Sequence, residues 1–179
     1  MTLAIPVKLV EHDLRWATRA GDYTRLLAPL ADMLVAVHHI GSTAVPGLIS
    51  KPVIDLMPIA VNLEALDARR GDVEALGLRW NGEFGVDGRR FCTLDNALGQ
   101  RLANVHFYAQ GSPHARRHLA LRDYLRSHPH VAAAYAVEKR RAQAIHPDDS
   151  VAYSAEKGAW IRATLERALA CYDDGGDTR

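Results

Sequence analysis

Residues 35–60 read VAVHHIGSTAVPGLISKPVIDLMPIA and contain two apolar runs joined by a small-residue turn. The first run, residues 35–40, is rich in β-branched residues and ends at residues 41–43, Gly-Ser-Thr, which predicts a strand that stops at a tight turn. The second run, residues 53–59, predicts another strand, whose one acid is Asp55. The amides of a small-residue turn can bind a phosphate oxygen, and a carboxylate among apolar residues needs a partner or a metal. This stretch therefore predicts a site for an anion and a divalent cation.

The segments on either side predict a small sheet followed by helices. Apolar residues recur every three or four positions from Trp16 to Leu34, which predicts either one helix kinked near Pro29 or two short helices. Residues 3–10 are expected to form a short edge strand. The other predicted elements are a helix over 63–76, a hairpin of 78–80 with 89–94, a strand over 102–109, and helices over 113–127, 130–145 and 150–171. This order indicates an α+β fold with a mixed sheet and a C-terminal helical bundle.

The composition is that of an ordinary globular chain. Its 179 residues are 48% hydrophobic and 24% charged, and the formal net charge of +1 creates no global field toward nucleic acid or membrane. No apolar run approaches the ~18 residues of a membrane span, and Cys92 and Cys171 are expected to be free thiols in a reducing cytoplasm. We expect one cytoplasmic domain over residues 1–179, with a sheet part at about 1–111 and a helical part at about 112–171.

The sequence from His39 to Asp55, HIGSTAVPGLISKPVID, resembles the signature of the GrpB family. The resemblance continues in residues 121–129, LRDYLRSHP, and at Tyr135, Lys139, Tyr153 and Lys157. It implies a nucleotidyltransferase-like fold, in which a mixed β-sheet carries flanking helices and a C-terminal helical bundle. Family members also occur fused to dephospho-CoA kinases. The resemblance covers nearly the whole chain, and it implies a fold rather than a defined reaction.

Nucleotidyltransferases place two acids, one residue apart, a short spacer after a Gly-Ser pair. Here twelve residues separate Ser42 from Asp55, which fits that spacing, but Met57 stands where the second acid is expected. Two such acids jointly hold two Mg²⁺ ions about 3.5–4 Å apart, whereas one acid can hold one hydrated Mg²⁺ with help from phosphates. Mg²⁺ is thus the cofactor that the resemblance implies. The alternative is a relic site in which Asp55 pairs with a nearby Lys or Arg.

The strand expected over residues 102–109 carries a histidine on its polar face. With a period of two, Asn104, His106 and Tyr108 share that face. The resemblance places this face where the third acid of a nucleotidyltransferase approaches the metal. We therefore expect His106 to bind a metal or to act as an acid or base near Asp55. The alternative is a half-solvated surface strand.

Two lysines, Lys139 and Lys157, occupy expected inward faces of the C-terminal helices. An inward lysine can snorkel, pair with an acid or reach into a cleft. With Lys51, Arg90 and the stripe of Arg122 and Arg126 they predict a cationic pocket opposite Asp55 for a phosphate or carboxylate. The alternative is solvated surface ion pairs. The residues expected to bind the ligand are His39, Gly41, Ser42, Thr43, Lys51, Arg90, Arg122, Lys139 and Lys157, and the expected catalytic residues are Asp55, also the metal ligand, and His106.

These residues predict a protein that binds a nucleotide or another phosphorylated small molecule and is able to transfer a nucleotidyl or phosphoryl group with Mg²⁺. Met57 in place of an acid favours the alternative of a non-catalytic ligand-sensing or partner-binding module, so the sequence leaves open whether the protein is an enzyme. Nucleic acid binding has little basis. The cationic surplus is confined to residues 112–146, with seven Arg and Lys against two acids, and it forms no basic surface interleaved with aromatic residues.

Overall fold

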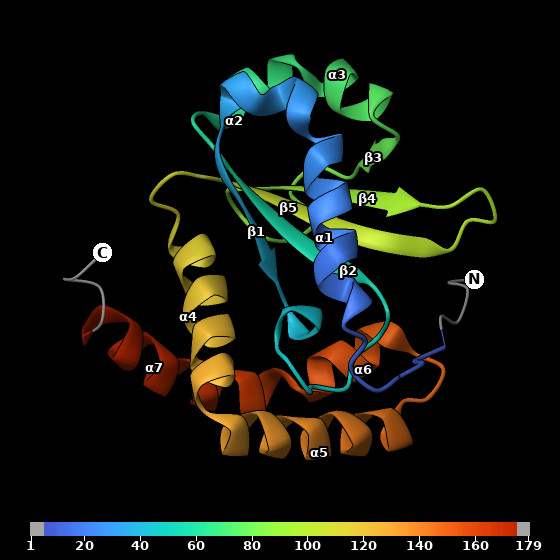
Figure 1. The fold of residues 1–179 in the computed structure, drawn as a ribbon, viewed down its shortest axis with the longest axis vertical. Coiled ribbons are helices and arrows are strands. Elements are labelled where there is room, and N and C mark those ends of the chain that lie inside the picture. The colour runs from blue at the N-terminus through green and yellow to red at the C-terminus, as the bar shows by residue number, and fades with distance from the viewer. Residues whose placement is uncertain (1–5, 175–179) are drawn as a thin grey trace. The chain divides into compact units, whose positions relative to one another are not determined.

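A five-stranded mixed β-sheet is built around the two strands expected from residues 35–60. The computed structural model describes residues 6–174, and its strands are β1 (Leu34–Ile40), β2 (Ile54–Ala60), β3 (Leu78–Trp80), β4 (Arg89–Asp95) and β5 (Arg101–Ala109). Their order is β1-β2-β5-β4-β3; β2 and β5 run parallel, and the other neighbours run antiparallel (Figure 1). The predicted α+β fold with a mixed sheet is confirmed.

The strand register separates a polar row from an apolar row. Residues paired across neighbouring strands lie on the same face of a sheet. Asp55 of β2 pairs with Asn104 of β5, which pairs with Thr93 of β4. One position further along β2 the paired residues are Leu56, Val105 and Cys92, and all three are buried. The sheet therefore presents Asp55 and Asn104 on one face and an apolar core layer on the other.

Two predicted helices before residue 77 are interrupted. The segment from Trp16 to Leu34 forms α1 (Arg15–Leu26) and a 3₁₀ helix, η1 (Ala28–Met33), because Pro29 at the start of η1 has no amide to continue α1. This is the two-helix alternative. The helix expected over 63–76 is divided into α2 (Leu63–Ala68) and α3 (Arg70–Ala75) by Arg69, whose φ of −103° and ψ of 22° leave helical geometry.

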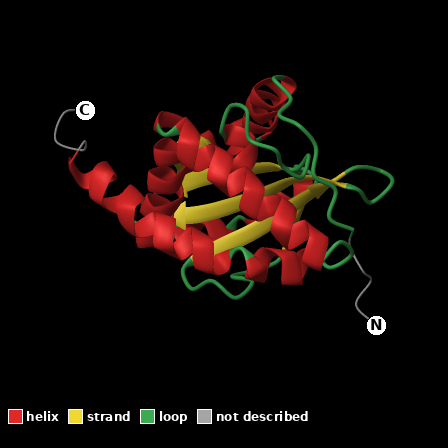
Figure 2. Cartoon of the chain, turned by 90° about the horizontal axis from the view of Figure 1, so that it is seen from below, coloured by secondary structure: helices red, strands yellow, loops and turns green. Residues whose placement is uncertain are grey.

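The C-terminal part is helical, as predicted. It comprises α4 (Pro113–Ser127), α5 (Pro129–Ile145), α6 (Ser150–Glu156) and α7 (Gly158–Asp174), which are labelled in Figure 1; Figure 2 draws all helices of the chain in red. The single helix expected over 150–171 is wrong, because Lys157 caps the end of α6 and Gly158 begins α7. Asp149 caps the start of α6 by accepting hydrogen bonds from two backbone amides at 2.9 Å.

The edge strand expected over residues 3–10 is not formed by its described part. Residues 3–5 lie outside the described residues, and residues 6–10 contribute one isolated bridge, between Val10 and Ser50. Pro6 cannot donate a ladder hydrogen bond, which is consistent with this short pairing.

The chain divides into two compact units that interleave along the sequence. The sheet unit comprises Asp13–Ala44 and Val53–Arg116; the helical unit comprises Met1–His12, of which residues 6–12 are described, Val45–Pro52 and Arg117–Arg179. The buried core of the helical unit contains Val45, Leu48, Leu125, Val131, Ala132 and Tyr135. Residues 45–52 of the loop between β1 and β2 thus belong to the helical unit, and the number of domains stays a prediction.

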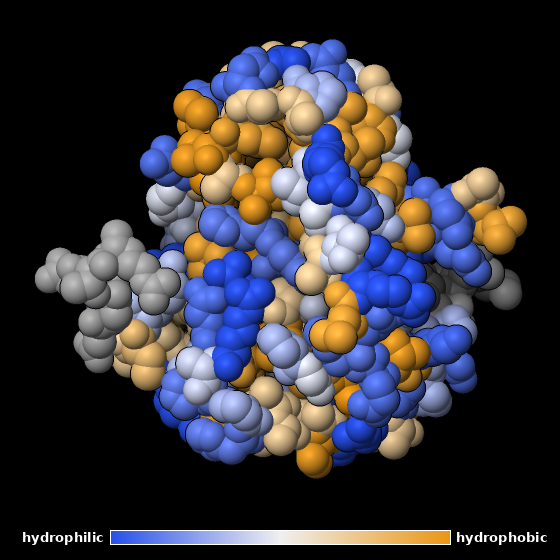
Figure 3. Space-filling view, in the orientation of Figure 1, coloured by the Kyte–Doolittle hydropathy of each residue, from blue (hydrophilic) through white to orange (hydrophobic). Residues whose placement is uncertain are grey.

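The surface mixes apolar and hydrophilic residues. The face shown in Figure 3 has orange and blue residues interspersed. The most exposed large apolar side chains are Leu14, Leu98 and Val151, which is ordinary for a globular chain. None of the helices within residues 6–174 has the length and apolar character required to cross a membrane.

Candidate functional site

Asp55 lies near the start of β2 with two polar partners from β5. Its Oδ1 accepts a hydrogen bond from Nδ2 of Asn104 at 2.9 Å, and Nε2 of His106 lies 3.5 Å from the same oxygen. Asn104 and His106 are two residues apart on a strand, so both side chains point to the Asp55 face. The side chain of Asp55 is 28% exposed and that of His106 is 13% exposed. We refer to these three residues as the carboxylate cluster.

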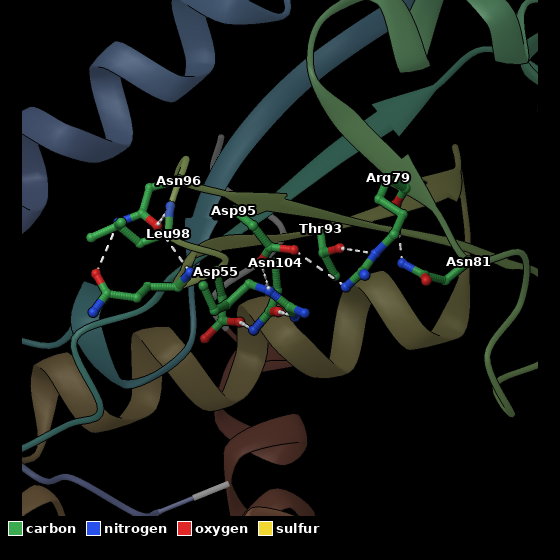
Figure 4. Close-up of polar contacts among 10 residues, drawn as sticks. Asp55, Arg79, Asn81, Thr93, Asp95, Asn96, Leu98 and Asn104 are labelled. Atoms are coloured by element: carbon green, nitrogen blue, oxygen red, sulfur yellow. Dashed lines mark hydrogen bonds and ion pairs between the residues drawn. The ribbon is translucent and has the colours of Figure 1, made fainter. Parts of the chain in front are cut away.

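A chain of polar contacts extends the carboxylate cluster along the sheet (Figure 4). Nη1 of Arg101 donates to Oδ1 of Asn104 at 2.9 Å, and Nε of Arg101 donates to Asp95 at 2.5 Å. Asp95 in turn lies 3.2 Å from Nη2 of Arg79. Because each bond polarises the next, the amide that donates to Asp55 is oriented by the charge pairs behind it.

The turn after β1 brings the backbone against Asp55. Gly41 has a φ of +70°, and a Cβ atom at that position would lie 2.5 Å from Oδ2 of Asp55. A 3₁₀ turn, η2 (Ser42–Ala44), follows, and the Ala44 amide donates to the Gly41 carbonyl at 3.2 Å. Glycine is required at residue 41 both by its left-handed backbone and by the approach to the carboxylate.

His39, which is expected to bind the ligand, does not lie on the Asp55 face of the sheet. In the register of β1 with β2, Ile40 pairs with Asp55 and His39 pairs with Leu56, so His39 lies on the opposite face from Asp55. Nε2 of His39 is 2.9 Å from the hydroxyl of Thr43, which is buried. This contact links the end of β1 to η2 and thereby supports the turn.

The buried residue Met57 occupies the position at which nucleotidyltransferases have their second metal-binding acid. Met57 lies two residues after Asp55 on the same face of β2 and is 0% exposed. Within residues 6–174 no group of three or more His, Cys, Asp or Glu side chains is placed to hold a metal ion. The donors of the carboxylate cluster are one carboxylate, one amide and one imidazole. They fit one hydrated Mg²⁺ at most, and two-metal chemistry lacks its second carboxylate.

Arg90 does not lie opposite Asp55. In β4 it pairs with Phe107 of β5, whereas its neighbour Phe91 pairs with His106, so Arg90 lies on the other face of the sheet. Its Nε and Nη2 donate to Asp67 at 2.6 and 2.7 Å. This charge-assisted bond holds the pKa of Asp67 below its usual range and raises that of Arg90. Arg90 therefore stabilises the face of the sheet opposite Asp55 by its ion pair with Asp67.

Sequence reasoning missed Arg89, which lies on the His106 face. It pairs with Tyr108 in the register of β4 with β5, and its Nη1 is 3.5 Å from Nδ1 of His106. The period of two that assigned Tyr108 and His106 to one face of β5 would also have selected Arg89, once the hairpin register was known.

Lys139 and Lys157 of the helical unit gather around two tyrosines. Nζ of Lys139 donates to the carbonyl oxygen of Ile49 at 2.6 Å and lies 5.2 Å from the ring centre of Tyr135. Nζ of Lys157 lies 4.1 Å from the ring centre of Tyr153 and 6.0 Å from that of Tyr135. Ammonium groups over aromatic rings are attracted by the ring quadrupole, which favours keeping these cations inside the unit.

Lys51 completes this group, which we call the lysine cluster: Lys51, Lys139 and Lys157 with Tyr135 and Tyr153. Its Nζ donates to the hydroxyl of Ser150 at 2.8 Å and lies 5.6 Å from the Tyr153 ring centre. Lys139 is 3% exposed and Lys157 is 9% exposed. These two lysines are therefore buried, and the alternative of solvated surface ion pairs does not describe them.

The hydroxyl of Tyr153 is buried and has no hydrogen-bond partner among residues 6–174. Burial raises the pKa of Tyr153 to about 12, so the group is a neutral O–H donor at ordinary pH. Leaving such a donor unpaired costs about 1–3 kcal/mol, and a native structure that keeps one commonly reserves it for a ligand, a water or an ion.

Arg122 is held by the residue that follows it. Its Nε and Nη2 donate to the two carboxylate oxygens of Asp123 at 2.7 and 3.0 Å. Arg126 lies 3.8 Å from Asp123, and burial together with the charge of Arg122 lowers the pKa of Arg126. The Arg122–Asp123 pair thus has a local structural role, and ligand binding by Arg122 stays a prediction.

The two clusters belong to different units. The carboxylate cluster and Gly41 lie in the sheet unit, whereas the lysine cluster and Arg122 lie in the helical unit. Each unit thus carries its own group of candidate functional side chains, and the expected single pocket containing both stays a prediction.

Comparisons with known proteins match nearly the whole chain. A crystal structure of the conserved protein GrpB from Enterococcus faecalis has a TM-score of 0.85 and 33% sequence identity, covering 92% of this chain and 99% of that one. The UPF0157 protein YqkA of Bacillus subtilis is 36% identical over 163 residues, 90% of this chain and 47% of YqkA. A dephospho-CoA kinase of Mycolicibacterium paratuberculosis is 30% identical over 195 residues, 96% of this chain and 48% of that protein. This chain therefore spans about half the length of these two relatives.

The family model described as GrpB protein matches residues 6–167. That range contains the Gly41 turn, the whole carboxylate cluster and all three lysines of the lysine cluster. Because the match covers most of the chain, the chain belongs to the GrpB family.

Proposed function

We propose that this protein binds a nucleotide or another phosphorylated small molecule through the lysine cluster. The observation that carries the proposal is the buried hydroxyl of Tyr153, which has no hydrogen-bond partner among residues 6–174, on a ring over which the ammonium groups of Lys51 and Lys157 lie. Ammonium and O–H groups donate hydrogen bonds and accept none from an anion, which is the chemistry that binds phosphate oxygens. The long relative named dephospho-CoA kinase supports a phosphorylated ligand.

The carboxylate cluster, which belongs to the sheet unit, supports a transfer reaction on an observation of its own. Asp55 is partly exposed and held by Asn104 and His106, so its carboxylate has a fixed position from which to accept a proton or hold one hydrated Mg²⁺. Electrostatic stabilisation supplies most of the catalysis in nucleotidyl and phosphoryl transfer. We propose that Asp55 has this role if the protein turns over its ligand.

A specific observation favours a second candidate, a non-catalytic ligand-sensing or partner-binding module. Met57 is fully buried at the position where the second acid is expected. Its side chain is part of the core and cannot bind a metal as a carboxylate would. A protein of this kind would bind the phosphorylated ligand with the same lysines and leave it unchanged.

Thermal unfolding in the presence of phosphate compounds tests the binding. Sodium phosphate, sodium pyrophosphate and ATP are each added at constant ionic strength, with and without MgCl₂. A ligand at 100 times its Kd stabilises the folded state by about 2.7 kcal/mol. For a chain of this size that free energy raises Tm by about 5–10 °C.

Three variants assign the effect to the lysine cluster. Lys157→Met and Tyr153→Phe each remove one donor and are expected to lose most of the ligand-induced rise in Tm. Lys8→Met is the matched control, because Lys8 is exposed and belongs to the same unit. If no phosphate compound raises Tm, or if Lys8→Met loses as much of the rise as Lys157→Met, the proposal is wrong.

Turnover separates the two candidate functions. Release of phosphate or pyrophosphate from ATP with Mg²⁺ is measured for the native protein and for Asp55→Asn, which keeps the size of the side chain. A reaction that Asp55→Asn abolishes identifies a transferase or hydrolase. Binding that survives without any release in the native protein identifies the non-catalytic module.

A further inference from the structure

Arg89 connects His106 to the hairpin loop between β3 and β4. Its Nη2 donates to the carbonyl oxygen of Phe84 at 2.7 Å, and its Nε donates to that of Glu83 at 3.1 Å. Its Nη1 lies 3.5 Å from Nδ1 of His106, and its guanidinium carbon lies 4.9 Å from the ring centre of Phe91. One side chain thus joins the loop, the aromatic ring beside His106 and the imidazole itself.

The loop that Arg89 holds is in a constrained conformation. Phe84 has a φ of +48°, which is uncommon for a residue with a side chain, and its ring stacks on Phe91 with centroids 5.2 Å apart. Phe91 in turn lies 5.1 Å from the imidazole of His106. The two carbonyl bonds from Arg89 therefore fix a loop that would otherwise relax, and they fix the guanidinium in place next to His106.

The chemistry of arginine decides which nitrogen of His106 carries the proton. A guanidinium only donates hydrogen bonds, so Nδ1 of His106 must accept when it faces Nη1 of Arg89. A neutral imidazole has one N–H, which then lies on Nε2. That nitrogen is 3.5 Å from Oδ1 of Asp55, an oxygen that accepts and does not donate.

We propose that Arg89 is a positioning residue that fixes the Nε2-protonated tautomer of His106, so that His106 donates its one N–H to Asp55. Oδ1 of Asp55 then accepts from both Asn104 and His106, which fixes the orientation of the carboxylate. His106 orients Asp55 and does not abstract a proton itself. This assignment differs from the acid or base role that sequence reasoning gave to His106, and it concerns the sheet unit alone.

Nuclear magnetic resonance of protein labelled with ¹⁵N-histidine tests this assignment without any ligand. Long-range proton–nitrogen correlation spectra distinguish the Nε2–H tautomer, the Nδ1–H tautomer and the imidazolium, and His106→Gln identifies the signals of His106. In the native protein at neutral pH, His106 is expected to show the Nε2–H pattern. In Arg89→Met the nitrogen shifts of His106 are expected to move toward an average of the two tautomers.

Arg90→Met is the matched control. It removes the adjacent guanidinium, which lies on the other face of the sheet and is bound to Asp67, with weaker contacts to Glu83 at 3.4 Å and to the Arg89 carbonyl at 3.2 Å. Because Arg89 keeps its own bonds to the loop in this variant, the His106 pattern is expected to stay unchanged. An Nδ1–H or imidazolium pattern in the native protein overturns the proposal, and so does an unchanged pattern in a folded Arg89→Met. The native spectrum decides the tautomer even if Arg89→Met does not fold. Because no phosphate compound is present, the outcome is independent of the ligand-binding proposal.

Discussion

Oδ2 of Asp55 occupies the space that a side chain at Gly41 would need, since a Cβ atom there would lie 2.5 Å from that oxygen. The turn that follows β1 and the acid near the start of β2 are therefore in close contact. This contact explains why the small residue and the acid occur together in the stretch that specifies the two strands. It also means that the position of the carboxylate depends on the backbone of the turn as well as on Asn104.

Gly41→Ala is expected to destabilise the protein more than an ordinary substitution of a left-handed glycine. Gly99→Ala is the control, because Gly99 has a φ of +73° with nothing within 4 Å of the added carbon, and it should cost about 1–2 kcal/mol. Gly41→Ala should cost a further ~1.5–3 kcal/mol, since the displaced carboxylate loses its hydrogen bond to Asn104. Urea unfolding of both variants measures the difference, and equal losses would contradict the close approach.

Tyr153→Phe is expected to leave the ligand-free protein as stable as the native protein, or to stabilise it by up to ~1 kcal/mol. The change removes a buried O–H that has no partner among the described residues, while the ring and its packing remain. Guanidinium chloride unfolding without phosphate measures this. A loss of more than ~1 kcal/mol would show that the hydroxyl is already paired in the ligand-free state.

The same tyrosine gives the native protein a particular dependence on alkaline pH. The pKa of Tyr153 is raised from 10.0 to about 12 by burial, so the folded protein keeps a proton that the unfolded chain loses above pH 10. The contribution of this group to the free energy of unfolding is fully present below pH 10 and is lost as the pH rises toward 12. The difference in unfolding free energy between the native protein and Tyr153→Phe should therefore change between pH 10 and pH 12 in favour of the variant.

The Arg90–Asp67 pair is expected to contribute to acid stability. The hydrogen bond from Arg90 lowers the pKa of Asp67, so the contribution is present above the ordinary pKa of Asp67 and is lost as pH falls through the lowered value. Arg90→Met should therefore lower stability at neutral pH and flatten the loss of stability between about pH 5 and pH 2. Unfolding midpoints across that range, compared with Arg70→Met, whose guanidinium forms an exposed helix pair with Glu74, provide the measurement.

The two thiols should differ sharply in reactivity. Cys92 is fully buried, and burial raises its pKa to about 12, whereas Cys171 is exposed. Because the thiolate is the reactive form, one thiol per chain is expected to react with iodoacetamide in the native protein at pH 8, and two after unfolding. Mass spectrometry of digested protein identifies the site; rapid labelling of Cys92 in the folded state would argue that β4 opens readily.

The sequence predicted the strands well because β-branched runs ended by glycine or polar turns carry local information. β1, β2, β5 and the hairpin of β3 with β4 lie where residues 35–60 and the later runs placed them. The sequence also predicted the inward position of Lys139 and Lys157, since Lys139 lies among the small residues of α5 and Lys157 lies between Tyr153 and Trp160 in the sequence. Helix continuity was harder to predict, because the breaks at Arg69 and Lys157 depend on packing and capping and not on a proline.

To predict which side chains meet in the candidate site, the register of the strands must be known. Local sequence patterns do not contain this information. Only the pairing of Ile40 with Asp55 shows that His39 faces away, and only the pairing of Arg90 with Phe107 shows that its neighbour Arg89 is the one near His106. A shift of one residue would exchange these roles, since it turns every side chain of a strand to the other face. The unpaired hydroxyl of Tyr153 likewise follows from three-dimensional burial alone.

The interleaving of the two units has a consequence for how this chain can be divided. The peptide backbone leaves the sheet unit at residue 45, returns at residue 53 and leaves again at residue 117, so no single truncation point yields either unit whole. Limited proteolysis between β1 and β2 would sever a segment of one unit from the remainder of that same unit. Each unit therefore needs segments from both sides of the other, and the chain as a whole matches about half the length of two longer relatives.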